Sequence, residues 1–139
     1  FLGDTDDSII QPLTEKLVEQ MKAKKYFNLV LKGLGVFKSI RDPKVIWIGI
    51  NKSSELQMLK NEIDAIMFDF GFKANEREFK PHLTLGRVKF IHNKTEFKDL
   101  IEKYKETEFG KVVIDKVIFY ESRLTPQGPV YKTIKEIDF

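Results

Sequence analysis

Three residues in one short stretch have side chains that could act together on a phosphate ester. His82, Thr84 and Arg87 lie within residues 80–88, which read KPHLTLGRV. An imidazole can transfer a proton, a hydroxyl can donate a hydrogen bond, and a guanidinium presents a fork of donors to phosphate oxygens. Such short motifs also arise by chance, so an edge strand that happens to carry a His and a Thr is the alternative interpretation of the bare pattern.

The stretch is predicted to be a β-strand that presents these side chains on one face. Leu83 and Leu85 favour extended backbone, and side chains two residues apart share a face. His82 and Thr84 would therefore stand side by side, roughly 7 Å apart along the strand, and exposed. The two leucines are expected to pack into a core on the other face. Gly86 permits a bend or a bulge before the arginine that follows it.

The composition narrows the classes of protein and site that need to be considered. A chain of 139 residues predicts a single domain, and its net charge of +3 permits an anionic partner without requiring one. The absence of cysteine excludes disulfides, thiol catalysis and thiolate metal sites, and with only His82 and His92 as imidazoles we do not expect a His-rich zinc site. We expect no cofactor. We find neither an apolar run of membrane-spanning length nor a signal peptide, so a soluble cytoplasmic protein is expected.

Hydrophobic periodicity predicts an α+β fold of mostly antiparallel strands, with the helices on one face of the sheets. The expected elements are, in chain order, a helix from the acidic turn 4–7 to about residue 25, strands 27–37 and 45–50, a helix 54–70, the strand with His82, a helix capped by Asn93 or Thr95, and strands 112–120 and 130–137. The last two strands are expected to form a hairpin. The uncovered sheet face is left for a cleft that His82 and Thr84 could line.

Three other features favour structural over chemical interpretations. Gly33 and Gly35 could begin a dinucleotide-binding loop, but position 38 is a lysine where that fingerprint needs a third glycine, so a bulge or a bend in a strand is favoured. Trp47 could stack on a base, although a core position is favoured for a lone tryptophan. His92 is interpreted as a surface residue at a strand-to-helix junction.

The motif PHLTLGRV at residues 81–88 resembles the second signature of the two-histidine phosphoesterases. The branch that it resembles is the bacterial and archaeal RNA 2′,3′-cyclic phosphodiesterases, also called 2′-5′ RNA ligases. Further stretches are similar to that family in order and spacing: FLGD at 1–4, GLGVF at 33–37, VIWIG at 45–49, FG at 109–110, SRL at 122–124 and GPVY at 128–131. The resemblance therefore covers the whole chain.

The resemblance implies a two-lobed α+β domain over residues 1–139, in which each lobe gives one His-x-Thr strand to a central cleft. One His would act as general base and the other as general acid, with no metal. On this sequence His82 and Thr84 match catalytic positions, and Thr84 and Arg87 match substrate-binding positions.

The activity that the resemblance implies is hydrolysis of 2′,3′-cyclic phosphate RNA ends to a 2′-phosphate, with 2′-5′ RNA ligation as a second activity. The implied partners are RNAs with a cyclic phosphate or a 2′-5′ linkage, tRNA fragments among them. The protein is expected to be a monomer that does not bind membranes.

The first His-x-Thr signature of that family is missing from this sequence. His92 does not replace it, because the residue two positions later is Lys94 rather than threonine. In the family the signature lies just before the residues that match Phe1, so a preceding strand, helix and strand are expected upstream, and residues 1–139 alone are expected to be inactive. The alternatives are a catalytically inactive RNA-binding domain of the same fold and a scaffold domain in which the motif is incidental.

Overall fold

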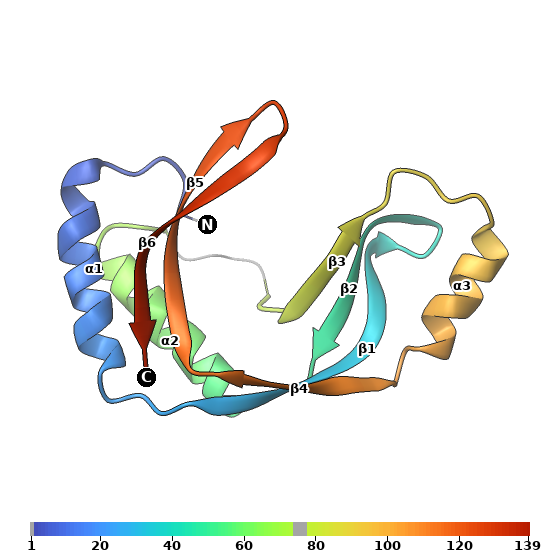
Figure 1. The fold of residues 1–139 in the computed structure, drawn as a ribbon, viewed down its shortest axis with the longest axis horizontal. Helices are drawn as coiled ribbons and strands as arrows, with labels where there is room; N and C mark the ends of the chain where they lie inside the picture. The colour runs from blue at the N-terminus through green and yellow to red at the C-terminus, as the bar shows by residue number, and fades with distance from the viewer. Residues whose placement is uncertain (1, 74–77) are drawn as a thin grey trace. The chain divides into compact units, whose positions relative to one another are not determined.

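The computed structural model describes residues 2–73 and 78–139, which form three α-helices and six β-strands (Figure 1). In chain order these are α1 (Asp7–Met21), β1 (Phe27–Ser39), β2 (Asp42–Ile50), α2 (Ser54–Asp69), β3 (His82–Arg87), α3 (Lys94–Lys103), β4 (Glu108–Ile114), β5 (Lys116–Thr125) and β6 (Gly128–Asp138). The predicted α+β fold is confirmed. Phe1, which begins one of the stretches that resemble the phosphoesterases, lies outside the described residues.

The chain divides into two compact units, and each is built from segments that are distant in sequence. We call them the helical unit, residues 1–27, 54–76 and 114–139, and the sheet unit, residues 28–53 and 77–113. The helical unit contains α1, α2, β5 and β6, and the sheet unit contains β2, β3, α3 and most of β1 and β4. The motif strand β3 therefore belongs to the sheet unit.

The helical unit packs two helices against an antiparallel hairpin of β5 and β6 (Figure 1). Its core is formed by buried side chains of α1, α2 and β6, namely Leu13, Leu17, Met21, Leu59, Ile66 and Ile137. Asp6 caps α1 by accepting a hydrogen bond from the Ser8 backbone N–H, and Gly71, with a φ of 85°, follows the end of α2. None of the helices that the structure describes has the length and apolar character needed to cross a membrane.

The sheet unit is a four-stranded sheet in the order β3-β2-β1-β4, so the motif strand lies at one edge. Asn93 caps α3 by accepting from two backbone N–H groups, which settles one of the two predicted caps. A hydrogen bond of 3.0 Å from the Leu34 N–H to the Tyr104 carbonyl ties the end of α3 to β1. The register of β1 shifts between Leu31 and Leu34, which confirms the predicted bulge around Gly33.

Two sequence predictions about the strands are wrong. The predicted strand 112–120 is two strands, β4 and β5, which belong to different units, because the chain leaves one sheet at Asp115 and enters the hairpin. The Asp115 carbonyl accepts instead from the Phe139 N–H at 2.8 Å.

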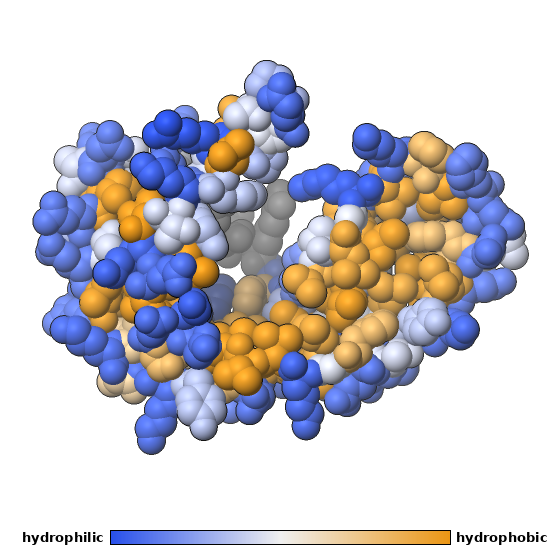
Figure 2. Space-filling model, in the orientation of Figure 1, coloured by the Kyte–Doolittle hydropathy of each residue, from blue (hydrophilic) through white to orange (hydrophobic). Residues whose placement is uncertain are grey.

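The predicted burial of two leucines is also wrong, because Leu83 and Leu85 are 48% and 55% exposed. They lie on an edge strand, which has a neighbouring strand on one side only. Figure 2 shows hydrophobic residues gathered over the sheet unit, with hydrophilic residues around its rim.

Candidate functional site

The pairing of β3 with β2 places His82 and Thr84 on one face of the sheet. His82 lies opposite Gly49, and Thr84 lies opposite Trp47, in an antiparallel ladder. Directly opposed residues share a face, and Gly49 and Trp47 are two residues apart on β2. Both motif side chains are exposed, as predicted.

A β-bulge brings Arg87 to the same face as His82 and Thr84. Simple alternation along β3 would point position 87 away from positions 82 and 84. The register, however, advances two residues on β3, from Thr84 to Gly86, against one on β2, so Leu85 has no partner. After this extra residue Arg87 lies opposite Val45, which shares the Trp47 face of β2.

The His82 imidazole is held through one ring nitrogen, which leaves the other open. Its Nδ1 lies 2.6 Å from the Lys80 carbonyl oxygen. A carbonyl oxygen can only accept, so Nδ1 carries the hydrogen and donates. Nε2 is then the nitrogen that accepts a proton in the neutral ring and gives one up from the imidazolium. Proton transfer by this side chain is therefore directed through Nε2.

Two aromatic rings that were not among the predicted site residues pack beside His82. Phe37 meets the imidazole edge-on, with ring centroids 4.6 Å apart and planes at 86°. Trp47 lies against both, with centroids 5.4 Å from Phe37 and 6.4 Å from His82. The predicted core position of Trp47 is met only in part, because its side chain is part-buried and is not among the buried hydrophobic residues of the described chain.

Glycines on the two central strands make room for the Trp47 ring. A Cβ added to Gly35 would come within 2.3 Å of two atoms of that ring. At Gly49 an added Cβ would lie 3.3 Å from the ring and 2.6 Å from the Lys32 carbonyl oxygen. One signal could have revealed this packing from sequence: a tryptophan that has one glycine opposite it and a second glycine two positions further along its own strand.

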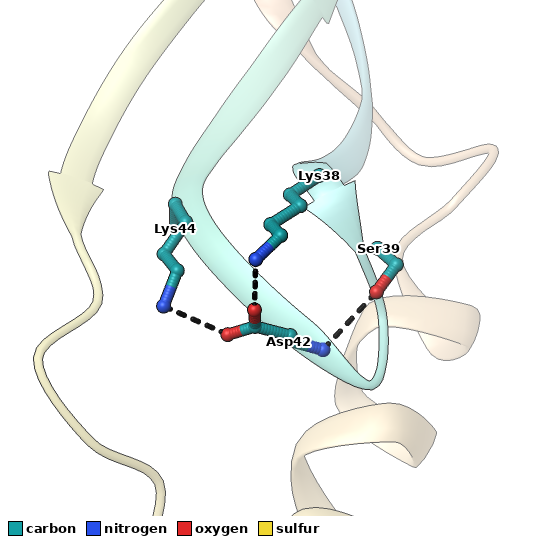
Figure 3. Close-up of polar contacts among 4 residues, drawn as sticks. All are labelled: Lys38, Ser39, Asp42 and Lys44. Atoms are coloured by element: carbon teal, nitrogen blue, oxygen red, sulfur yellow. Dashed lines mark hydrogen bonds and ion pairs between the residues drawn. The ribbon is translucent and has the colours of Figure 1, made fainter.

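The hairpin between β1 and β2 carries a cluster of charges near the end of β3 (Figure 3). Asp42 forms ion pairs with Lys38 and Lys44, the latter at 2.8 Å, and its backbone N–H donates to the Ser39 hydroxyl. Hydrogen bonds from Lys38 and then from Lys44 lower the pKa of the Asp42 carboxyl to about 2. The carboxylate thus stays ionised and holds two ammonium groups beside it.

The other histidine lies apart from this ladder. His92 is exposed just before α3, as predicted, and its ring contacts Phe90 with centroids 4.7 Å apart. Among the residues that the structure describes, no three side chains of His, Cys, Asp or Glu gather as they would around a metal ion. The face with His82, Thr84 and Arg87 thus offers one proton-transfer nitrogen, one hydroxyl and one guanidinium. Acid–base displacement at phosphorus needs a second proton-transfer group, because one group takes a proton and another gives one.

Comparison with known proteins places this arrangement in one family. Residues 5–139 match the family model described as the AKAP7 2′5′ RNA ligase-like domain. A protein of Methanocaldococcus jannaschii named RNA 2′,3′-cyclic phosphodiesterase is 41% identical over 138 residues, which are 98% of this chain and 75% of that protein. A protein of Thermotoga maritima with the same name is 36% identical over 141 residues, covering 100% of this chain and 72% of that protein.

Solved structures show the same fold at lower sequence identity. A crystal structure from Thermus thermophilus superposes with a TM-score of 0.78 at 22% identity, covering 99% of this chain and 74% of that one. The crystal structure of E. coli LigT complexed with 3′-AMP gives a TM-score of 0.70 at 20% identity, covering 99% and 72%. At these identities the likeness concerns the fold alone.

Proposed function

We propose that this chain, which belongs to the family of AKAP7 2′5′ RNA ligase-like domains, acts as an RNA 2′,3′-cyclic phosphodiesterase and carries one half of its active site. The substrate would be an RNA whose 3′ end is a 2′,3′-cyclic phosphate, and the product would keep the phosphate on the 2′ oxygen. RNAs with a 2′-5′ linkage, tRNA fragments among them, are the second class of partner.

The observation that carries the proposal is the orientation of the His82 ring. Its Nδ1 donates a hydrogen bond to the Lys80 carbonyl, so Nε2 is the ring nitrogen that can act as base or acid. His82 is exposed, and the register of β3 places Thr84 and Arg87 on the same face of the sheet, so a phosphate held by those two side chains could be reached by this nitrogen.

The reaction can be written with every bond and proton accounted for. One group removes a proton from water as the water oxygen bonds to phosphorus, and the bond from phosphorus to O3′ breaks. A second group gives a proton to O3′, which leaves as the 3′-hydroxyl, and a 2′-phosphate monoester remains. Because one group must be neutral and the other protonated, the rate is expected to pass through a maximum as pH rises.

Thr84 and Arg87 are proposed to hold the phosphate during this displacement. The Thr84 hydroxyl can donate to one non-bridging oxygen, and the Arg87 guanidinium can donate to two at once. Arg87 forms no ion pair with the residues that the structure describes, so its charge is available to the substrate. Such donors stabilise the charge that builds up on the phosphoryl oxygens.

The second proton-transfer group is proposed to be the His of a first His-x-Thr signature, as the resemblance implies. His92 is a poor candidate, because it lies outside the β2–β3 ladder and packs on Phe90. The cheapest check is the coding sequence before Phe1, where an in-frame His-x-Thr is expected. A stop codon or an unrelated sequence there would favour the inactive RNA-binding domain instead.

The activity is tested with the product of the complete reading frame that contains residues 1–139. A defined RNA ending in a 2′,3′-cyclic phosphate is incubated with it in excess EDTA, and the expected product is the 2′-phosphate. His82→Ala should abolish most of the turnover, whereas the matched change His92→Ala should leave it unchanged. A 3′-phosphate product, or loss of activity in the chelator, would refute the mechanism, and RNA binding without turnover would identify an inactive binding domain.

The tautomer of His82 offers a test that needs no substrate. In the product of the complete reading frame, the ¹⁵N ring signals of His82 are identified by their loss in His82→Ala. Neutral His82 is expected to carry its hydrogen on Nδ1. A neutral ring protonated on Nε2 would contradict the proposed direction of proton transfer.

A further inference from the structure

The basic charge of the chain is concentrated at one end of the sheet unit. Residues 38–44 and 87–89 contain five basic side chains, Lys38, Arg41, Lys44, Arg87 and Lys89, and one acidic side chain, Asp42. These two short segments have a net charge of +4, whereas the whole chain has +3. The remaining residues are therefore slightly acidic in sum, and the basic charge is local.

The backbone joins these two segments into one surface, which we call the basic end. Lys44 is an extra residue on β2, because the register passes from the pair of Phe37 and Val45 to the pair of Lys38 and Pro43. Its carbonyl accepts a hydrogen bond from the Val88 N–H at 3.0 Å, which fixes the end of β3 beside it. The basic end is thus continuous with the edge strand that carries His82.

The hairpin at the basic end has a conformation that sequence preference alone does not explain. Lys38 has a φ of 80°, and it is the one non-glycine residue among those the structure describes with a positive φ. Such a conformation is uncommon for lysine and persists where the surrounding structure holds it. The Asp42 carboxylate provides that hold, since it pairs with both Lys38 and Lys44 (Figure 3).

The closing of the hairpin explains why Lys38 and Lys44 pair with Asp42, but it does not explain the other basic side chains of the basic end. Arg41 and Lys89 form no ion pair with the described residues, and each lysine amine that faces Asp42 keeps further N–H donors. Five residue steps along β2 lead from Gly49, which lies opposite His82, to Lys44, a distance of about 17 Å, which exceeds the length of a single nucleotide.

We propose that the basic end binds the backbone phosphates of the RNA on the 5′ side of its cyclic phosphate end. The terminal nucleotide would lie at His82, Thr84 and Arg87, and the preceding nucleotides would run along β3 toward Arg41 and Lys44. This inference rests on the proposed function and adds to it: the protein prefers an RNA strand to a cyclic mononucleotide.

Salt dependence measures the number of phosphate contacts. For single-stranded nucleic acid each contact contributes about 0.7 to the slope of log affinity against log salt. Replacing Arg41 and Lys44 by glutamine should therefore reduce the slope by about 1.4. At 0.15 M salt the same arithmetic gives about a four-fold loss of affinity for each contact and roughly fifteen-fold for both.

The experiment uses the product of the complete reading frame and a fluorescent RNA pentamer that ends in a 2′-phosphate. Binding of the double variant R41Q/K44Q is measured at salt concentrations from about 0.05 M to about 0.3 M, so that the slope of log affinity against log salt can be determined. The matched control is K111Q/K116Q, which likewise removes one basic side chain without an ion pair among the described residues and one lysine that pairs with a carboxylate. R41Q alone, which breaks no ion pair, covers the case in which the double variant does not fold.

The proposal is supported if the slope falls for R41Q/K44Q, and by about half as much for R41Q, but not for K111Q/K116Q. It is overturned if the slope is unchanged or if the control lowers it equally. Turnover is measured in parallel on adenosine 2′,3′-cyclic phosphate and on a pentamer with a cyclic end, and only the pentamer should react more slowly with R41Q/K44Q. If neither is hydrolysed by the unaltered protein, the proposed function fails, while the binding slopes still decide this inference.

Discussion

Replacing Gly35 by alanine tests whether the Trp47 ring holds the site face of the sheet. A Cβ at position 35 would lie 2.3 Å from two atoms of the ring and 2.8 Å from a third, whereas ordinary contact begins at 3.4 Å. The ring or the strand must therefore move by about 1 Å, and overpacking of this kind typically costs about 1–3 kcal/mol. Because Phe37 and His82 both pack on Trp47, the displacement should reach the imidazole.

The chain reports on this change by itself, because Trp47 is its single tryptophan and lies in the sheet unit. Urea unfolding followed by tryptophan fluorescence therefore measures the free energy of unfolding of that unit. With an m value of about 2 kcal/mol/M, the midpoint should fall by roughly 0.5–1.5 M urea. The ring signals of His82 should shift in the same variant, since its aromatic neighbours move.

Gly86→Ala is the matched control, because it lies on the same pair of strands and nothing is within 4 Å of the added Cβ. Its free energy of unfolding should be unchanged or raised by about 0.4–1 kcal/mol, through the reduced freedom of the unfolded chain. If Gly35→Ala unfolds at the same urea concentration as Gly86→Ala, the Trp47 ring is not fixed on the glycines and the explanation of how His82 is held is refuted.

Other perturbations follow from exposure and charge. His82→Ala should change the free energy of unfolding by less than about 0.5 kcal/mol, yet reduce turnover by about 10²- to 10⁴-fold, and an early thermal transition would show that His82 is structural. Leu83→Ala should cost less than about 1 kcal/mol in urea unfolding, because that side chain is half exposed, whereas Leu29→Ala, at a site 4% exposed, should cost about 2–5 kcal/mol. The lowered pKa of Asp42 means that its pairs stabilise the fold above the ordinary carboxyl pKa of 3.8 and that this is lost as pH falls toward 2, so Asp42→Asn should weaken the pH dependence of unfolding in that window. An unaltered pH dependence in Asp42→Asn would show that the pairs also persist in the unfolded chain.

The sequence was sufficient to predict the strand and the neighbouring side chains of the motif. Alternation around His82 and Thr84 identifies the strand and its exposed histidine, because both depend on local periodicity alone. The exposure of Leu83 could not be predicted in this way, since alternation says which face a side chain takes but not whether anything covers that face.

Features that depend on pairing between strands could not be predicted in the same way. The contact of Phe37 with His82 requires the register of β1, β2 and β3 together, which the sequence of any one strand does not specify. The break at Asp115 is hidden because residues on both sides favour extended structure, and only their different partners separate β4 from β5.

The bulge at Leu85 determines on which face of the sheet Arg87 lies, and therefore whether Arg87 can act together with His82. Deleting this one residue would restore an unbroken ladder and leave the arginine two positions after the threonine, so all three side chains would still share one face. If Leu85 were kept but paired with Ile46, the bulge would be lost and the arginine would turn to the opposite side, which would separate phosphate binding from proton transfer. In the evolution of such a strand, the extra residue and the bulge that accommodates it are therefore constrained together, because the arginine keeps its face either with both or with neither.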